Sequence, residues 1–149
     1  MRVYFDLCCL KRPFDSQEQL VVRLQTEAVL SLLALPPGTI ELLQSPALIL
    51  ENSMNPDQVR REAVALLLSA GEMVSPNEAD LTARIDDLVA KGFKSFDAFH
   101  LATAELSGAA VFVSVDGEFL KVAMRLSGGL HVPVTDPLRF IEEIAQWKH

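Results

Sequence analysis

Four acidic residues occupy positions at which a carboxylate adds little to folding. Asp6 ends the apolar run RVYFD, and Asp116 ends the apolar run VFVSVD. Glu51 follows a run of Ala, Leu and Ile residues, and Asp97 stands early in the amphipathic segment KSFDAFHLATAE. Taken singly, each acid has an ordinary explanation: a turn, a helix cap, an exposed helix end, or a charge that favours the helix dipole. Two strands of one sheet that both end in Asp are harder to explain in this way.

A shared metal site is the alternative explanation for these acids. Clustered carboxylates raise one another's pKa values, and such a cluster persists where a divalent cation occupies it. Oxygen ligands without Cys or clustered His select Mg²⁺ or Mn²⁺ over Zn²⁺. One or two cations held in this way can activate water and stabilise the leaving oxygen of a phosphodiester. The four acids therefore indicate metal-dependent phosphoryl chemistry, provided that the fold brings them together.

The hydrophobic pattern predicts the elements that must position these acids. Strands are expected at 2–7, 39–45, 109–116 and 130–134. Helices are expected at 16–35, 45–54, 56–71, 78–92, 96–107, 117–129 and 136–149, and residues 8–17 are expected to form a loop. The predicted N-caps are Ser16, Ser45, Ser95 and Asp136, with Pro46 at a first helical position and Gly92 just after a helix end.

Apolar strands separated by helices predict an α/β fold with a parallel sheet covered on both faces. The length favours one domain, residues 1–149. Pro133 marks the last strand as an edge strand. In open α/β sheets, ligands bind beyond the carboxyl ends of the strands. We therefore expect Asp6 and Asp116 to lie at the ligand-binding edge of the sheet.

Composition limits the classes of function. The net charge is −7, which argues against binding nucleic acid through a broad basic surface but allows a substrate held locally through metal ions. Cys8 and Cys9 are adjacent, and a bridge between neighbours is strained, so we expect two small buried residues in a reducing cytoplasm. The sequence shows no signal peptide and no run of about 18 apolar residues. We therefore expect a cytoplasmic protein without a membrane span.

Three segments together resemble a known family: VYFDLCCLKRPFD, SPALILENSMNPD and GFKSFDAFHLATAELSGAAVFVSVDGEFLK. They look like a PIN domain, the fold of many bacterial toxin ribonucleases of the VapC type. The resemblance covers residues 2–141, and its most specific part is D-A-x-H-L-A-T-A followed by V-x-V-S-x-D-x-x-F-L. It implies a PIN-like three-layer α/β/α fold and an endoribonuclease that cleaves RNA with Mg²⁺ or Mn²⁺. It also implies a homodimer and, for a toxin, a protein antitoxin as partner.

The resemblance assigns roles by position. The catalytic acids would be Asp6, Glu51 (rather than Glu41), Asp97 and Asp116, and the metal ligands Asp6, Asp97, Asp116 and a more variable acid, Glu118. Ser114 would bond a site carboxylate or phosphate, or is simply a strand serine. His100, one turn beyond Asp97, would hydrogen-bond near the site or contact the substrate. We do not assign it as general base.

The resemblance also concerns four basic residues and two positions at which this sequence differs from the family pattern. Lys11 and Arg12 would bracket an RNA backbone, as could Lys121 and Arg125, although all four could be solvated surface charges. Leu7 and Cys8 stand where many members carry Ser, Thr or another polar residue, which would weaken metal or phosphate positioning. One alternative is therefore a catalytically weak or inactive PIN-like module that binds RNA or protein. An aspartate-nucleophile phosphatase is disfavoured, because it would need a second Asp at the position of Cys8.

Overall fold

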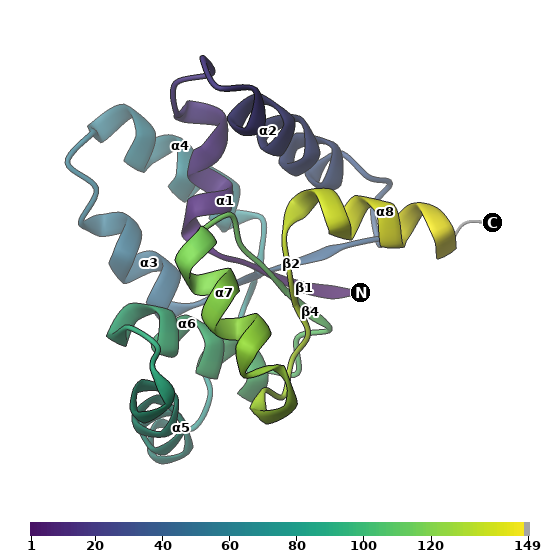
Figure 1. The fold of residues 1–149 in the computed structure, drawn as a ribbon. Coiled ribbons are helices and arrows are strands. Elements are labelled where there is room, and N and C mark those ends of the chain that lie inside the picture. The colour runs from purple at the N-terminus through teal and green to yellow at the C-terminus, as the bar shows by residue number, and fades with distance from the viewer. Residues whose placement is uncertain (148–149) are drawn as a thin grey trace.

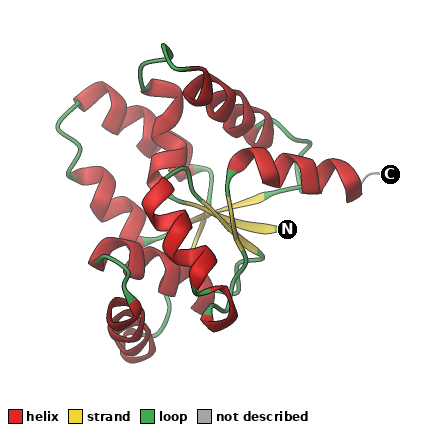
Figure 2. Ribbon diagram, in the orientation of Figure 1, coloured by secondary structure: helices red, strands yellow, loops and turns green. Residues whose placement is uncertain are grey.

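A five-stranded parallel sheet forms the centre of the molecule. The computed structural model describes residues 1–147 and orders the strands β3-β2-β1-β4-β5, all neighbours running parallel. The strands are β1 (Arg2–Phe5), β2 (Glu41–Gln44), β3 (Glu72–Met73), β4 (Val111–Val113) and β5 (Val134–Thr135). Figure 2 shows them crossing the middle of the molecule with a strong twist. The predicted α/β class with a parallel sheet is confirmed.

Eight α-helices among the described residues cover the sheet. They are α1 (Leu7–Lys11), α2 (Leu20–Leu33), α3 (Pro46–Ser53), α4 (Gln58–Ser69), α5 (Glu78–Lys91), α6 (Ser95–Leu106), α7 (Gly117–Arg125) and α8 (Pro137–Trp147), with short 3₁₀ turns at Arg12–Phe14 and Ser127–Gly129. In Figure 1, α2 and α8 lie together on one side of the sheet, and α5 and α6 lie on the other. The arrangement is the three-layer α/β/α architecture that was predicted.

The two central strands are apolar because both of their faces are covered. Val3, Tyr4 and Phe5 of β1 are fully buried. They pair in register with Val111, Phe112 and Val113 of β4, which are also buried. The Tyr4 ring stacks on Phe112 with ring centroids 5.2 Å apart. This packing fixes the direction in which the chain leaves both strands.

Several predicted helix boundaries are confirmed by the side chains that cap them. Ser45 Oγ accepts the backbone N–H of Leu48 at 3.2 Å, and Pro46 occupies the first position of α3. Asp136 accepts two backbone N–H groups at the start of α8. Gly92 ends α5 with a φ of 120°, a conformation that favours glycine.

The segment after the first strand was predicted wrongly. Residues 8–17 were expected to form a loop, but α1 and a 3₁₀ turn occupy most of them. Asp6 starts α1 by accepting the backbone N–H of Leu7 at 2.9 Å. Leu7 and Leu10 then enter the core. A helix of five residues shows too little periodicity to be recognised from the sequence.

Other boundaries are shifted. The helix expected from Ser16 begins at Leu20, with Gln19 before it. Ser95 is the first residue of α6 rather than its cap, because Lys94 holds the cap position without a side-chain hydrogen bond. The last strand is Val134–Thr135 instead of 130–134, although it lies at an edge as predicted. Strand β3, at the opposite edge, was not predicted, and both of its residues are exposed.

Two further findings concern the described residues. Among residues 1–147, no helix is both long enough and apolar enough to cross a membrane. Both cysteines carry free thiols: Cys9 is buried and Cys8 is half-buried.

Candidate metal centre

The four predicted catalytic acids line one pocket. Asp6 follows β1 and Asp116 follows β4, and these neighbouring parallel strands end at the same edge of the sheet. Glu51 comes from the last turn of α3, and Asp97 from the first turn of α6. The pocket measures about 300 Å³, and its other lining residues are Leu7, Cys8, Lys11, Met54, Asn55 and Pro56. Acids from four distant parts of the sequence thus meet in space.

Asp6 is the most enclosed of the four acids, with 6% of its surface exposed. Its carboxylate accepts hydrogen bonds from Ser114 Oγ at 3.0 Å and from Cys8 Sγ at 3.5 Å. Burial raises the pKa of the Asp6 carboxyl, whereas the nearby His100 and the Ser114 hydrogen bond oppose that rise. Ser114 Oγ also accepts the backbone N–H of Asp116 at 3.1 Å. This one hydroxyl therefore ties two of the acids together.

The pKa of Asp97 depends on its burial and on the charges of its acidic neighbours. Burial, together with the charges of Asp6 and Asp116, raises its pKa to about 6, and the nearby His100 opposes the rise. A carboxyl in the first turn of a helix would otherwise hold its proton less tightly. The site thus carries more negative charge than its own side chains neutralise.

Asp116 combines a structural position with a place in the pocket. One of its oxygens, Oδ1, accepts the backbone N–H groups of Glu118 and Phe119 and so caps α7. Asp116 still lines the pocket with the other acids. Asp116 therefore caps α7 and lines the pocket at the same time.

His100 lies behind the pocket in a buried chain of hydrogen bonds. Its Nε2 is 3.2 Å from Glu51 Oε1, and its Nδ1 is 2.7 Å from the Tyr4 hydroxyl. The Tyr4 hydroxyl lies 2.8 Å from Ser45 Oγ. Tyr4 was not predicted as a site residue, and Ser45 was predicted only as a helix cap. No local pattern marks either residue, because their partners lie up to 96 positions away.

The donor atoms of the site fit a divalent cation. One ligand atom from each of Asp6, Glu51 and His100 lies within 4.8 Å of the other two. Carboxylate oxygens and an imidazole nitrogen are suitable ligands for Mn²⁺ and for other first-row divalent cations. Burial and the charges of Asp6 and Asp116 raise the pKa of Asp97, and a cation bound nearby would oppose that rise.

Four residues that were predicted to bind metal or RNA lie outside the pocket: Glu118, Arg12, Lys121 and Arg125. Glu118 is largely exposed, and its carboxylate pairs with Lys94 at 3.4 Å without lining the pocket. Arg12 pairs with Asp15 at 3.1 Å, so its guanidinium is engaged outside the pocket. The second predicted cation pair, Lys121 and Arg125 on α7, does not line the pocket either. Lys11 does line the pocket.

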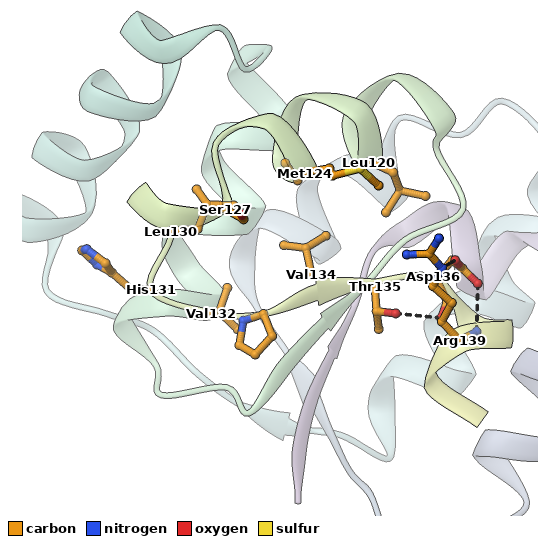
Figure 3. A pocket seen from close by; sticks show the side chains of 12 residues that line it. Leu120, Met124, Ser127, Leu130, His131, Val132, Val134, Thr135, Asp136 and Arg139 are labelled. Atoms are coloured by element: carbon orange, nitrogen blue, oxygen red, sulfur yellow. Dashed lines mark hydrogen bonds and ion pairs between the residues drawn. The ribbon is translucent and has the colours of Figure 1, made fainter. Parts of the chain in front are cut away.

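A second pocket, of about 620 Å³, lies away from the acids (Figure 3). It separates α7 from the edge strand β5, and most of its lining side chains are apolar, including Met124 and Val134. Its charged members Asp136 and Arg139 pair with each other at 3.6 Å. It shares no residue with the acidic pocket. The clustered carboxylates therefore single out the smaller pocket.

Comparison with known families agrees with this geometry. The family model of the PIN domain matches residues 38–124. The chain belongs to the PIN domain family. The matched segment contains Glu51, Asp97 and Asp116, and Asp6 joins them through the pairing of β1 with β4. The resemblance drawn from the motifs is thus confirmed at the level of the family.

A solved structure shares the PIN fold seen here. It is described as the 2.2 Å structure of VapBC-1 from nontypeable Haemophilus influenzae. The match has a TM-score of 0.58 at 11% sequence identity and covers 93% of this chain and 99% of the other. At that identity the likeness establishes the fold. No curated protein matches the sequence.

Proposed function

We propose that this PIN domain is a metal-dependent endoribonuclease that hydrolyses RNA phosphodiester bonds. The observation that carries the proposal is the convergence of Asp6, Glu51, Asp97 and Asp116 in one pocket beyond the sheet edge. Membership of the PIN family supports a nuclease rather than another user of clustered acids. The RNA target is left open, because the geometry of one pocket carries no sequence code.

Each residue has a proposed task in this reaction. Asp6, Asp97 and Asp116 hold Mg²⁺ or Mn²⁺, and Glu51 takes the place predicted for Glu118, whose side chain lies on the surface. A divalent cation held there would act as a Lewis acid toward a water molecule and toward the charge of the phosphate. Ser114 orients Asp6 through its 3.0 Å hydrogen bond.

Lys11 is the cation best placed to contact RNA. It lines the same pocket as the acids. A lysine ammonium binds a phosphate oxygen as a point charge and positions the backbone without reading its sequence. Arg12, engaged with Asp15, is not assigned a substrate contact.

The toxin role and its partners are a further part of the proposal. The chain shares its fold with a structure named VapBC-1, and we propose a protein antitoxin as its partner. A homodimer is also proposed, because α2 exposes Leu20, Val21 and Leu24 by 62%, 52% and 41%. Growth arrest on expression of the chain alone, relieved by the product of a neighbouring gene, would support the toxin role.

A catalytically weak binding module is the second candidate, and the residues after Asp6 are what favours it. Leu7 is buried in the core and offers no hydroxyl to the pocket. Cys8 supplies only a long thiol contact, 3.5 Å, to Asp6. Such a module would bind RNA without cutting it.

The deciding experiment is cleavage of a mixed, structured RNA pool with Mn²⁺ or Mg²⁺. The comparison includes the unmodified protein, Asp6→Asn, Asp97→Asn and, as a matched control, Asp86→Asn on the exposed face of α5. We expect cleavage only with a cation, its loss in both site variants, and its retention in the control. A folded protein that binds the pool but never cuts it would favour the binding module. Cleavage that survives both site substitutions would remove the site assignment.

A further inference from the structure

The buried chain that ends at Glu51 is more elaborate than carboxylate chemistry requires. It runs from Ser45 Oγ through the Tyr4 hydroxyl to His100 Nδ1, and from His100 Nε2 to Glu51. Tyr4 and Ser45 have no exposed surface, and His100 has 1%. Three buried polar groups in a row are costly unless each is satisfied, so the fold sets the orientation of this imidazole closely.

Resting on the proposed function, we propose that His100 Nε2 is itself a ligand of the cation, together with Asp6 and Glu51. The site would then be a mixed carboxylate–imidazole centre, not a purely acidic one. Imidazole is a ligand of first-row transition cations and contributes little to Mg²⁺ sites. The inferred preference is therefore for Mn²⁺, Co²⁺ or Zn²⁺ over Mg²⁺.

The separations of the donor atoms support this assignment. Ligands on one such cation, at bond lengths of about 2.0–2.2 Å, lie about 3–4 Å apart. His100 Nε2 and Glu51 Oε1 are 3.2 Å apart, which already matches. The ligand atoms of Asp6, Glu51 and His100 all lie within 4.8 Å of one another. A small closure around a cation would complete the set.

The hydrogen-bond chain can leave the lone pair of Nε2 facing the carboxylates. Ser45 Oγ accepts the N–H of Leu48 at 3.2 Å and has a second lone pair that can accept the Tyr4 hydroxyl. The Tyr4 oxygen can then accept N–H from His100 Nδ1 at 2.7 Å. Histidines that bind metals are usually held in this way, with the other ring nitrogen donating a hydrogen bond.

The reverse orientation satisfies the same atoms without a cation. Ser45 then donates to Tyr4, Tyr4 donates to Nδ1, and Nε2–H donates to Glu51. In this reverse direction every hydroxyl and ring N–H has an acceptor, whereas the first direction leaves the Ser45 O–H without one among the hydrogen bonds of residues 1–147. A cation bound at Nε2 would offset that difference and so select the first direction. Tyr4 and Ser45 act as positioning residues in either case.

The first test detects the nitrogen ligand directly. Mn²⁺ alone is added to the full-length protein, and pulsed EPR measures the ¹⁴N coupling of a directly bound imidazole. We expect the coupling in the unmodified protein and in Asp86→Asn, and its loss in His100→Gln. The Gln amide can still donate to Glu51, so it keeps the positioning contact but removes the nitrogen ligand. Bound Mn²⁺ without ¹⁴N coupling in the unmodified protein would overturn the inference.

The second test compares affinities for two cations by calorimetry. We expect His100→Gln to weaken Co²⁺ binding by about tenfold or more, and Mg²⁺ binding by less than about threefold. Tyr4→Phe keeps the ring that stacks on Phe112 and should weaken Co²⁺ binding in the same direction. Equal losses for both cations would mean that His100 only positions Glu51, which would also overturn the inference.

Failure of the proposed function would look different. If no cation binds, or if Asp6→Asn leaves cation binding unchanged, the metal site itself is wrong and both proposals fall. If Mn²⁺ binds through the acids and supports RNA cleavage but shows no ¹⁴N coupling, only the role of His100 is lost.

Discussion

The Asp97 carboxyl is costly to ionise in the folded protein. Its pKa is raised to about 6 by burial and by its acidic neighbours, above the ordinary 3.8. Between those two values the folded protein holds a proton that the unfolded chain releases. The contribution of Asp97 to stability therefore improves as pH falls from about 7 towards 4, and ionised Asp97 is destabilising above about 6.

Asp97→Asn is accordingly expected to stabilise the cation-free protein at pH 7.5. One pKa unit corresponds to about 1.4 kcal/mol, but Asp97 is only half-buried and solvent screens it, so we expect roughly 1 kcal/mol. Urea unfolding in chelator measures the change. The gain should shrink at pH 4.5 and reverse when Mn²⁺ is present. Equal stability of Asp97→Asn and the exposed control Asp86→Asn at pH 7.5 would contradict this account.

For single residues, the sequence predicted the acids that line the pocket but not the buried residues that hydrogen-bond behind it. Asp6 and Asp116 could be predicted because a charge at the end of an apolar strand contrasts with its neighbours. Tyr4 and Ser45 could not, because a buried tyrosine and a capping serine are ordinary residues in such positions. Their importance arises from contacts across 41 and 96 positions of chain. Sequence spacing carries no information about such distances.

Ser45 connects α3 to the site, because it both caps the helix and contacts Tyr4. Ser45→Ala removes a cap, which costs about 1 kcal/mol, and leaves the buried Tyr4 hydroxyl with one partner fewer. We expect a loss of about 2 kcal/mol in the free energy of unfolding, measured by urea denaturation. Ser95→Ala is the matched control, since Ser95 is not the cap of α6. A loss of similar size in both variants would refute the capping argument.

A buried ion pair joins α5 and α6 to the turn before β5. Arg84 contacts both carboxylate oxygens of Glu105, at 2.7 and 2.9 Å, and Glu105 also accepts the backbone N–H of His131. The Glu105 side chain is 1% exposed. Removing one member of such a pair leaves the other charge poorly compensated and typically costs about 3–5 kcal/mol.

Glu105→Gln should therefore lower the free energy of unfolding by about 3 kcal/mol, with little dependence on salt. Glu72→Gln provides the comparison, because its pair with Arg2 is largely exposed and should be worth less than about 1 kcal/mol. Thermal unfolding at low and high salt separates the two cases. Similar small losses in both variants would show that solvent reaches Glu105.

Elements were predictable in proportion to their length and burial. The apolar strands β1 and β4 and the long helices follow from hydrophobic pattern alone. The exposed two-residue strand β3 carries no such pattern and exists only because β2 offers it a free edge. The five-residue α1 is similar, since Asp6 and the buried Leu7 create it after the strand has placed them. Tertiary contacts decide these short elements.

The charge of the whole molecule sets how RNA reaches the site. A net charge of −7 repels a polyanion, so a broad contact with the RNA backbone is not available to a single chain. The acidic pocket contains Lys11 as its one lining cation among residues 1–147. Substrate capture should therefore depend on the bound cation and on few lysine–phosphate contacts.

This predicts a weak dependence of cleavage on salt. Each phosphate contact to a single strand contributes a slope of about −0.7 in log affinity against log salt, so one to three contacts give a slope between about −0.7 and −2. The measurement is kcat/KM at fixed Mn²⁺, with the salt concentration varied between about 50 and 200 mM. Lys11→Gln should reduce the slope by about 0.7. Lys121→Gln, outside the pocket, serves as control and should leave the slope unchanged.

A steep slope, near −5, would contradict the single-chain account, because it requires about seven phosphate contacts. A basic surface with that many phosphate contacts does not fit a single acidic chain. The contacts would then have to come from cations of two copies arranged along one RNA, such as Lys121 and Arg125 on each α7. Repeating the Lys121→Gln measurement in that case distinguishes the two routes. A slope that falls with Lys121→Gln but not with Lys11→Gln would place RNA along α7 and would leave the acidic pocket to bind only the scissile phosphate.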